Sequence, residues 1–279
     1  MPGVHVVTDS SCDLAPAEIE ALGVEIVPLT IRFGADEYTD GKNLSVGDFY
    51  DRMARSDELP QTACPSPGAF EEAFRRAGDA GADAVVCLTI SSHLSNTLQS
   101  ARTAATAFDG RPAVRVIDSR TVSSGLGTLV LEAAGVAAGG GDIDAVVHRV
   151  EGMVPRTHVM AVLNTLENLK KGGRIGGAKA LLGSMLSIKP VIDITGGEVH
   201  EAGKARTRAK ALHLLADRLL TAGEVEHVAV MHGRAADIDE FLALVAPRFP
   251  RRDVRVGELG AVIGAHGGAE IIGVSWVER

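Results

Sequence analysis

Several features that would assign a function at once are scarce in this 279-residue sequence. It contains three cysteines, Cys12, Cys64 and Cys87, and no CxxC pair. Cysteines spaced in this way form neither an even disulfide framework nor a redox motif, and no signal peptide is recognisable in MPGVHVVTDSS. No apolar run approaches the ~20 residues that a membrane-spanning helix requires. We therefore expect a cytoplasmic protein that does not span a membrane.

Positive charge and aromatic side chains are also in short supply. The formal net charge is −8 at pH 7, the 28 Lys and Arg residues are scattered along the chain, and Phe, Trp and Tyr make up only 4% of it. Nucleic-acid binding needs clustered positive charge for the phosphates and aromatic rings for stacking on the bases. We therefore expect no nucleic acid as a partner.

Signature motifs for nucleotides, metals and hydrolysis are missing as well. The sequence has no GKS or GKT, no HExxH, no EF-hand spacing and no GxSxG. GGRIGG, residues 172–177, resembles a dinucleotide fingerprint only loosely, because it follows an expected helix rather than a strand. No metal and no cofactor are therefore expected. Because a catalytic triad is defined by geometry rather than by sequence order, Ser95 and His266 with an aspartate such as Asp9 keep a metal-free serine hydrolase or acyltransferase open.

What the sequence does have is a large apolar fraction in alternating strand and helix patterns. Hydrophobic residues make up 46% and charged residues 23%, which is enough for a well-formed core. In the first half, short aliphatic runs alternate with helical patterns, and this alternation predicts a parallel sheet covered by helices on both faces. We expect strands at 4–7, 24–34, 85–90 and 114–118, and helices at 67–80, 97–107 and 125–138.

The pattern changes after the glycine-rich stretch AAGGGDID. HVMAVLN predicts a strand, IKPVIDITGGEVHEAG predicts a hairpin that turns at Gly196–Gly197, and TLENLKKGGRIGGAKALLGSM predicts two short helices joined at the paired glycines. We therefore expect an α/β fold with two lobes. Residues 1–153 would form an N-terminal, Rossmann-like lobe with a parallel sheet, and residues 154–279 a C-terminal mixed α/β lobe.

Small hydroxyl-bearing side chains follow three of the expected parallel strands. Val7 is followed by TDSS, Ile90 by SSHLSNT and Ile117 by DSRTVSSG. Such loops lie at the carboxyl edge of a parallel sheet, where ligands bind and helix N-termini present free N–H groups. Serine and threonine at such turns also cap helices, which contributes about 1 kcal/mol each. Because the pattern recurs at three strands, we favour a site for a carboxylate or a phosphate.

Six segments, taken in order, resemble motifs of the DegV family of bacterial fatty-acid-binding proteins. They are VVTDSSCDL, TACPSPGAFEEAF, LTISSHLSNTLQSA, VIDSRTVSSGLG, KGGRIGG and GAVIGAHGGAE. The resemblance implies that the two lobes form one DegV-like unit with a long-chain fatty acid buried between them. It also implies a lipid-binding carrier rather than an enzyme, with a fatty acid kinase as its partner. That kinase would phosphorylate the carboxylate to an acyl phosphate for phospholipid synthesis, and any contact with a membrane would be transient.

The resemblance also assigns ligand-binding residues. The family's carboxylate contacts match Thr62 and Ser95, and its nearby histidine matches His266. Asn96 stands beside the expected headgroup where the family usually has glycine, so its side chain would add a donor or narrow the site. Less specific matches, to contacts with the headgroup or with a partner, fall on Arg174 in GGRIGG and Arg206 in KARTR.

The chemistry of a fatty acid is compatible with these residues. A carboxylate that leaves water needs donors, and hydroxyl groups supply charge-assisted hydrogen bonds worth about 1.5–3 kcal/mol each. Each buried methylene contributes about 0.8 kcal/mol. The glycines around His266 indicate a turn or a close backbone approach, while Cys64 is expected to be a small buried hydrophobe. Besides the hydrolase or acyltransferase, a phosphosugar-type binding protein stays open, because the same hydroxyl groups could bind a phosphate.

Overall fold

A four-stranded parallel sheet forms the N-terminal half of the fold. The computed structural model describes residues 3–56, 58–110, 112–181 and 188–279. The strand order is β2-β1-β6-β7, with β1 (Val4–Asp9), β2 (Glu25–Val27), β6 (Ala84–Thr89) and β7 (Ala113–Asp118). All six residues of β6 are buried, as befits a central strand that is covered on both faces. The expected parallel-sheet lobe is confirmed.

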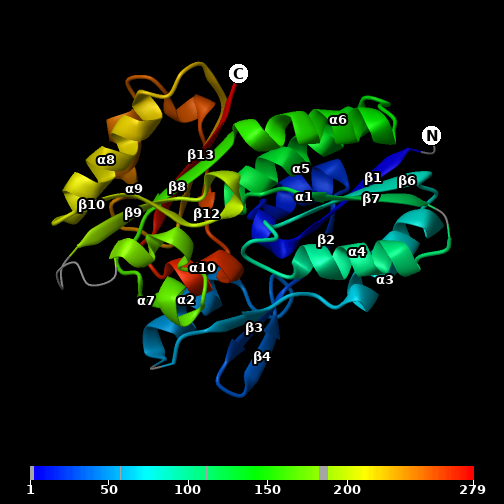
Figure 1. Cartoon of the computed structure of the whole chain (residues 1–279), viewed down its shortest axis with the longest axis horizontal. Coiled ribbons are helices and arrows are strands. Elements are labelled where there is room, and N and C mark those ends of the chain that lie inside the picture. The colour runs from blue at the N-terminus through cyan, green and yellow to red at the C-terminus, as the bar shows by residue number, and fades with distance from the viewer. Residues whose placement is uncertain (1–2, 57, 111, 182–187) are drawn as a thin grey trace.

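Helices cover both faces of this sheet, and the two faces of β6 show how. Val85 and Cys87 point to one face and pack with α3 and α4, while Val86 and Leu88 point to the other and pack with α5 and α6. Figure 1 shows these two helix pairs on opposite sides of the sheet. Their bounds are α3 (Pro67–Asp79), α4 (Thr97–Ala107), α5 (Ser123–Ala138) and α6 (Ile143–Met153), and α1 (Pro16–Leu22) follows the first strand.

A six-stranded mixed sheet forms the C-terminal half, in the order β10-β9-β8-β13-β11-β12. Its neighbouring strands are antiparallel except β11 and β12. One face packs against α8 and α9. The bounds are β8 (Thr157–Val162), β9 (Lys189–Asp193), β10 (His200–Ala205), α8 (Arg208–Leu220), β11 (Val225–His232), α9 (Ile238–Val245), β12 (Arg255–Glu258) and β13 (Ile272–Glu278).

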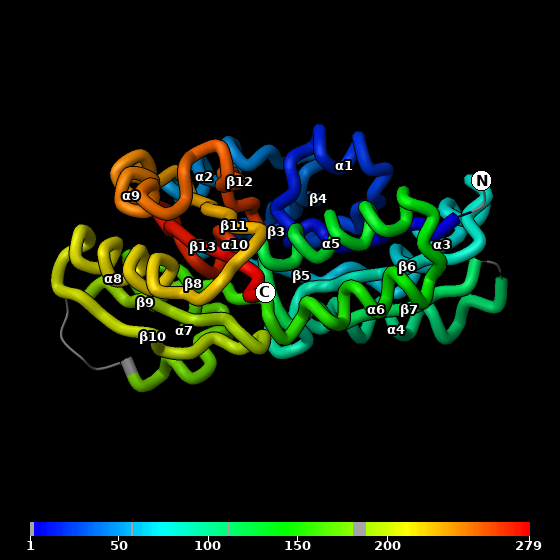
Figure 2. The backbone as a smooth tube through the Cα atoms, turned by 90° about the horizontal axis from the view of Figure 1, so that it is seen from above, coloured from blue at the N-terminus to red at the C-terminus, as the bar shows by residue number. Residues whose placement is uncertain are grey.

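Helix α5 joins the two halves. It contacts β1 and β6 of the first sheet and β8, β11 and β13 of the second, and one hydrophobic core runs through all of them. Gly125 makes this close packing achievable, because a Cβ there would lie 2.7 Å from Cγ2 of Val159 on β8. Viewed from above, the two sheets occupy opposite ends of the long axis with α5 near the junction (Figure 2).

A small antiparallel sheet, β4-β3-β5, lies beside this junction with α2 and α10 packed on it. Its members are β3 (Thr30–Phe33), β4 (Asp36–Thr39), α2 (Val46–Arg55), β5 (Gln61–Ala63) and α10 (Ala261–Gly267). The single strand expected over 24–34 is therefore wrong. Pro28 separates β2 from β3, and since proline has no N–H to donate, the chain leaves the four-stranded sheet there and enters the small sheet.

Most other expected elements are confirmed. Helix α4 has the expected bounds, and β9 and β10 form the expected hairpin, with Gly196 at φ 82° and Gly197 at φ 95°. GGRIGG does join α7 (Glu167–Lys171) to a 3₁₀ helix, Gly176–Leu181, and residues 182–185 of the expected second helix lie outside the described residues. Among the described helices, none combines the length and apolarity needed to cross a membrane.

Candidate ligand-binding site

A cavity of about 270 Å³ lies where β5, α10, the start of α4 and the second sheet meet. Most of its wall is aliphatic. The apolar side chains that line it are Leu29, Ile90, Leu94, Val122, Leu163, Leu169, Ile192, Ile194, Val199, Val262, Ile263 and Ile271. Such a wall can pack against a hydrocarbon, but its side chains offer no hydrogen bonds to a polar ligand.

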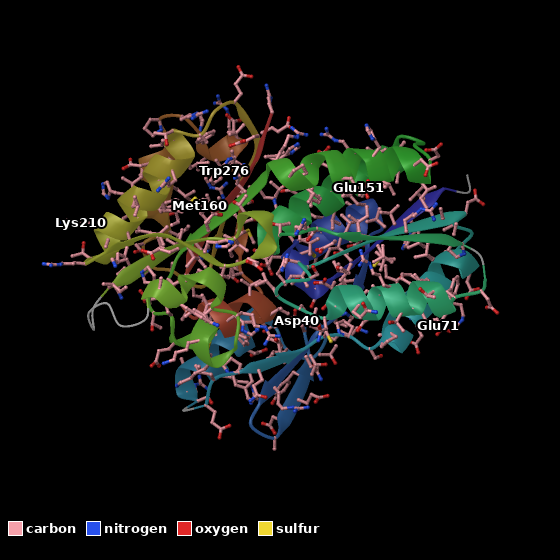
Figure 3. All side chains as sticks on the ribbon, viewed as in Figure 1. Asp40, Glu71, Glu151, Met160, Lys210 and Trp276 are labelled. Carbon is pink, nitrogen blue, oxygen red and sulfur yellow. The ribbon has the colours of Figure 1, made fainter. Side chains whose placement is uncertain are left out.

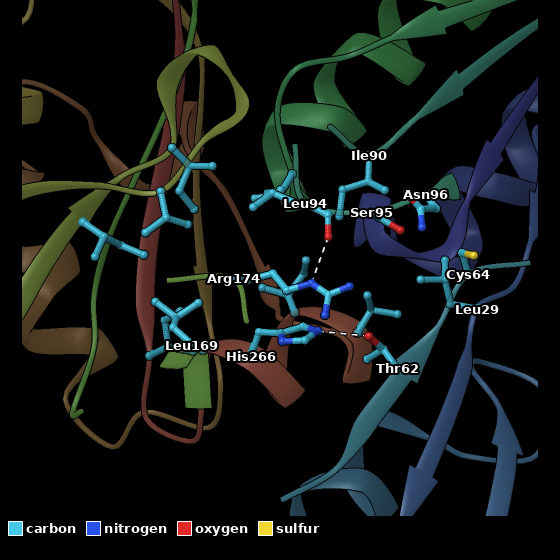
Figure 4. A pocket seen from close by; sticks show the side chains of 18 of the residues that line it. Leu29, Thr62, Cys64, Ile90, Leu94, Ser95, Asn96, Leu169, Arg174 and His266 are labelled. Carbon is cyan, nitrogen blue, oxygen red and sulfur yellow. Dashed lines mark hydrogen bonds between the residues drawn. The ribbon is translucent and has the colours of Figure 1, made fainter. Parts of the chain in front are cut away.

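The polar side chains of the cavity gather at one end. Figure 4 shows Thr62, Ser95, Asn96, Arg174 and His266 on one side of the cavity, with Leu169 beside His266 where the aliphatic part begins. They come from four distant segments of the chain, namely β5, the loop before α4, the GGRIGG segment and α10. Four site residues expected from the sequence, together with Arg174, therefore lie in one place.

Thr62 and His266 are directly bonded, with 2.9 Å between Oγ1 and Nε2. Burial, reinforced by the positive charge of Arg174, lowers the pKa of His266 to about 4, so the imidazole is neutral near pH 7. Its Nδ1 is buried without a hydrogen-bond partner in the described part of the chain. A neutral imidazole donates through one nitrogen only, and the Thr62 bond uses Nε2.

The glycines of GGRIGG and helix α7 fix the ring of His266 in place. A Cβ on Gly172 would lie 2.5 Å from Nδ1 of His266, so only glycine permits this contact. Nδ2 of Asn168 donates to the carbonyl of Ala265, at 3.3 Å, one residue before the histidine. Of the two alternatives that the sequence left open for the glycines around His266, a turn or a close backbone approach, the structure shows the second, because the residue lies within α10. The glycine signal reflects close packing, and Gly268, at φ 84°, ends the helix.

Arg174 brings a positive charge to the polar end. Its Nε donates to the carbonyl of Leu94 at 3.0 Å, and its Nη1 donates to the carbonyl of Gly172 at 2.6 Å. Within the described ranges, Arg174 has no carboxylate partner, although its side chain is half-buried. A guanidinium held by neutral carbonyls in a partly buried site favours an anionic ligand.

Ser95 and Asn96 lie at the start of α4. The backbone N–H of Thr97 donates to Oγ of Ser95 at 3.3 Å, and the two hydroxyl oxygens are 2.8 Å apart. Asn96 is exposed, and its side chain makes no capping bond to the helix. Its amide is therefore available at the mouth of the cavity.

Of the three hydroxyl-rich loops, only the middle one contributes polar side chains to this cavity. At the end of β1, Asp9 accepts the hydroxyl of Ser11 at 2.5 Å and the backbone N–H of Ile90 at 2.8 Å. After β7, Asp118 accepts the hydroxyl of Ser92 at 2.5 Å. These groups hold the ends of the strands together, so the interpretation of three loops sharing one ligand edge is wrong for two of them.

The triad that the sequence left open is not assembled. Nε2 of His266 bonds Thr62 rather than Ser95, and Asp9 is fully buried with its carboxylate bonded to Ser11 and Ile90. A nucleophile, a base and an orienting acid need consecutive hydrogen bonds, and Ser95, His266 and Asp9 form none with one another.

The surroundings of Cys64 and Arg206 differ from those expected from the sequence. Cys64 is exposed at the wall of the cavity rather than buried, because it follows β5, an edge strand of the small sheet. Arg206 is exposed just after β10 and lies outside the cavity lining. Across the described residues, no three His, Cys, Asp or Glu side chains are grouped so that they could hold a metal ion.

The structure defines an α/β protein with a largely aliphatic cavity that carries polar groups at one end, and comparisons with known proteins agree with the fold. The DegV family model matches residues 3–279, so the chain belongs to the DegV family. A DegV domain-containing protein of Deinococcus radiodurans is 38% identical over 284 residues, which cover 98% of this chain and 97% of that protein.

Solved structures of the family have the same fold. A DegV family protein from Thermus thermophilus, described by its fatty acid binding, superposes with a TM-score of 0.90 at 33% identity, covering 99% of this chain and 100% of that one. A stearic acid-binding protein from Eubacterium ventriosum superposes with a TM-score of 0.87 at 26% identity, covering 99% and 98% of the two chains. The motif resemblance noted in the sequence is thus confirmed at the level of the family.

Proposed function

We propose that this protein binds a long-chain fatty acid, with the carboxylate at the polar end of the cavity and the tail among its aliphatic side chains. The observation that carries this proposal is the segregation of the lining, since the polar groups lie at one end and the rest of the wall is largely aliphatic. A phosphosugar would need polar partners along its whole length. Fatty acid binding by two solved relatives supports the same choice.

The free energies show why both ends of the cavity are needed. Ten buried methylenes contribute about 8 kcal/mol at ~0.8 kcal/mol each. Association itself costs about 4–15 kcal/mol, so the tail alone gives weak binding or none. Two or three charge-assisted hydrogen bonds from Thr62, Ser95 and Arg174, at about 1.5–3 kcal/mol each, then decide whether the ligand is retained.

The neutral state of His266 fits this role. If Nε2–H of His266 donates to Oγ1 of Thr62, the Thr62 hydroxyl keeps its own hydrogen for the carboxylate. The other tautomer would use that hydrogen on the imidazole and would place an N–H at Nδ1, which is buried without a partner in the described part of the chain. We therefore assign the Nε2–H tautomer to the ligand-bound site.

We further propose that the protein is a carrier, which acts in the cytoplasm and presents the carboxylate to a separate fatty acid kinase. Asn96 and Cys64 are exposed beside the polar end, so a ligand carboxylate there lies near the surface. The kinase would transfer the γ-phosphoryl group of ATP to the carboxylate, and the acyl phosphate would feed phospholipid synthesis. Loading of the carrier would need only transient contact with a membrane.

Mass spectrometry of an organic extract from the purified, denatured protein tests the binding step. We expect a stoichiometric long-chain fatty acid, or uptake of one after incubation with oleate. A protein that neither carries nor takes up a fatty acid would contradict the proposal. The carrier step is tested with a fatty acid kinase of a DegV-containing bacterium, ATP and oleate, with acyl phosphate trapped as its hydroxamate. Hydrolysis of a p-nitrophenyl ester that disappears in Ser95→Ala would instead support the hydrolase.

A further inference from the structure

Asp13, in the N-terminal half, does not line the ligand cavity, but it accepts two hydrogen bonds from distant parts of the chain. It lies at the end of the 3₁₀ turn Ser10–Cys12, in the left-handed conformation, at φ 49° and ψ 37°. Its Oδ2 accepts the hydroxyl of Ser123, on α5, at 2.5 Å. Its Oδ1 accepts the backbone N–H of Gly260, 247 residues away, at 3.0 Å. The second bond crosses to the segment that begins α10.

Asp13 supplies an acceptor from outside the helix for the N–H of Gly260, at the start of α10. Gly260 is its N-cap residue and has no side chain with which to accept a first-turn N–H. A Cβ on Gly260 would lie 2.7 Å from Oδ1 of Asp13, so the close approach of the carboxylate itself requires glycine. The hydroxyl of Tyr50 donates to the carbonyl of Leu259, at 3.2 Å, and holds the preceding residue.

The same helix carries a large part of the ligand cavity. Val262, Ile263, His266 and Gly267 line it, and all four lie on α10. Because the helix rises about 1.5 Å per residue, His266 lies only ~9 Å from the Gly260 end. A helix this short moves as a rigid body, so a displacement at Gly260 changes the bond between His266 and Thr62.

We propose that Asp13 is a positioning residue for ligand binding, which places α10 so that His266 orients the hydroxyl of Thr62 toward the ligand carboxylate. This inference rests on the proposed function for its effect on fatty acids. The effect of Asp13 on the position of the His266 ring needs no ligand, so it can be measured in the ligand-free protein.

The surroundings of Asp13 make its ionisation, and with it ligand retention, depend on pH. Asp13 lines a second cavity of about 620 Å³ together with Cys12, Glu18, Asp40, Arg255 and Glu258. Burial raises the pKa of Asp13 to about 7. The hydrogen bonds from Ser123 and Gly260 oppose this rise, the charge of Asp40 adds to it, and the charge of Arg255 opposes it. Figure 3 places Asp40 near the middle of the molecule. Tyr50, on α2, also faces Asp13, and burial first and that charge second raise its pKa.

Ionised Asp13 accepts hydrogen bonds more strongly than the neutral acid does. Ligand retention should therefore increase as pH rises through about 7, while an ordinary carboxylate stays ionised across that range. His266, with its pKa near 4, stays neutral there. The pH dependence therefore reports Asp13 rather than the ligand or the histidine.

The experiment compares Asp13→Ala, which removes both acceptors, with Asp13→Asn, which keeps one for Gly260, and with Asp40→Asn as the matched control. Asp40 is a buried acid of the same cavity and makes no bond to α10. Two quantities are measured, the oleate dissociation rate between about pH 6 and 8, and the ¹⁵N signals of the His266 ring in ligand-free protein.

We expect Asp13→Ala to speed oleate dissociation about tenfold, the effect of losing one hydrogen bond to a charged acceptor, and to shift the His266 ring signals. Asp13→Asn should recover most of the affinity but lose the pH dependence. Asp40→Asn should keep the affinity and a pH dependence whose midpoint moves to lower pH, because the charge of Asp40 helps to raise the pKa of Asp13. Unchanged His266 signals in folded Asp13→Ala, or in Asp13→Asn a pH profile like that of the wild type, would overturn the inference. If the wild type binds no fatty acid, the proposed function fails, while the ring signals still test the link from Asp13 to His266.

Discussion

Thr62 and His266 are 204 positions apart in the sequence, yet Oγ1 and Nε2 lie 2.9 Å from each other. The bond joins an edge strand of the small sheet to a short helix near the C-terminus, and Arg174 approaches it from a third segment. No one of these segments forms a site by itself. Their meeting defines the polar end of the cavity and leads to four predictions.

Replacing Thr62 with Val and Ser95 with Ala should weaken oleate binding strongly while the protein still folds. Both side chains are partly exposed to the cavity, so the core loses no packing. Loss of two charge-assisted bonds at about 1.5–3 kcal/mol each predicts a Kd at least a hundredfold higher. Fluorescence displacement measures it, and Thr103→Ala, on the exposed face of α4, is the control. Unchanged affinity would remove these two residues from the headgroup site.

Arg174→Met should lower affinity for oleate but not for the methyl ester of oleate. Methionine keeps the apolar stem and removes the charge, and a lost hydrogen bond to a charged group costs about 1.5–3 kcal/mol, or roughly tenfold or more. Parallel titrations with acid and ester measure the difference. Arg206→Met, at an exposed position outside the cavity, is the matched control. An equal loss for both ligands would point to packing rather than to charge recognition.

Gly172→Ala should disrupt the site through a single methyl group. Its Cβ would lie 2.5 Å from Nδ1 of His266, so the ring must move and the bond to Thr62 must lengthen. We expect a clear loss of oleate affinity and a cost in stability of about 1–3 kcal/mol, as for other overpacked positions. Gly152→Ala is the control, because a Cβ there has open space within helix α6. That change should stabilise the protein by about 0.5–1 kcal/mol.

The stability of the ligand-free protein should fall as pH rises from about 4 to 7. Burial raises the pKa of Asp13 to about 7 and that of Asp40 to about 6, well above the ordinary value of an aspartate side chain. Across this window the folded state holds protons that the unfolded chain has lost, and the free energy of unfolding then decreases with pH. Asp13→Asn and Asp40→Asn should each flatten the curve in urea titrations, and exposed Asp109→Asn should not. His266 contributes in the opposite direction below about pH 6.5, because its pKa is lowered to about 4, so the test is the difference between each variant and the wild type. Curves of equal slope for wild type, Asp13→Asn and Asp40→Asn would contradict the prediction.

This direction is opposite to the one expected for ligand retention. An ionised Asp13 costs stability because it is buried, but it accepts the N–H of Gly260 more strongly. A residue with a purely structural role would move both quantities the same way. Measuring stability and oleate dissociation on one set of samples therefore separates the two roles.

The sequence predicted regular elements best where local physics decides them. Helix α4 and the hairpin of β9 and β10 followed from apolar spacing and from glycine placement. It failed where partners far away in the chain decide. Pro28 divides one apparent strand between two sheets. For the glycines around His266, the sequence left a turn and a close backbone approach open, and only the structure shows that they serve close packing. Neither outcome is readable from nearest neighbours.

The sequence by itself determined the α/β class, the family and the residue types that the polar end of the cavity contains, because periodicity and ordered motifs are local properties of the chain. Only the tertiary structure decided which of three similar hydroxyl loops faces the cavity, and that Arg174 reaches it while Arg206 does not. The reason is that every buried donor and acceptor needs a partner, and two of the loops find theirs inside the protein. Whether a serine serves a strand end or a ligand depends on what packs against it.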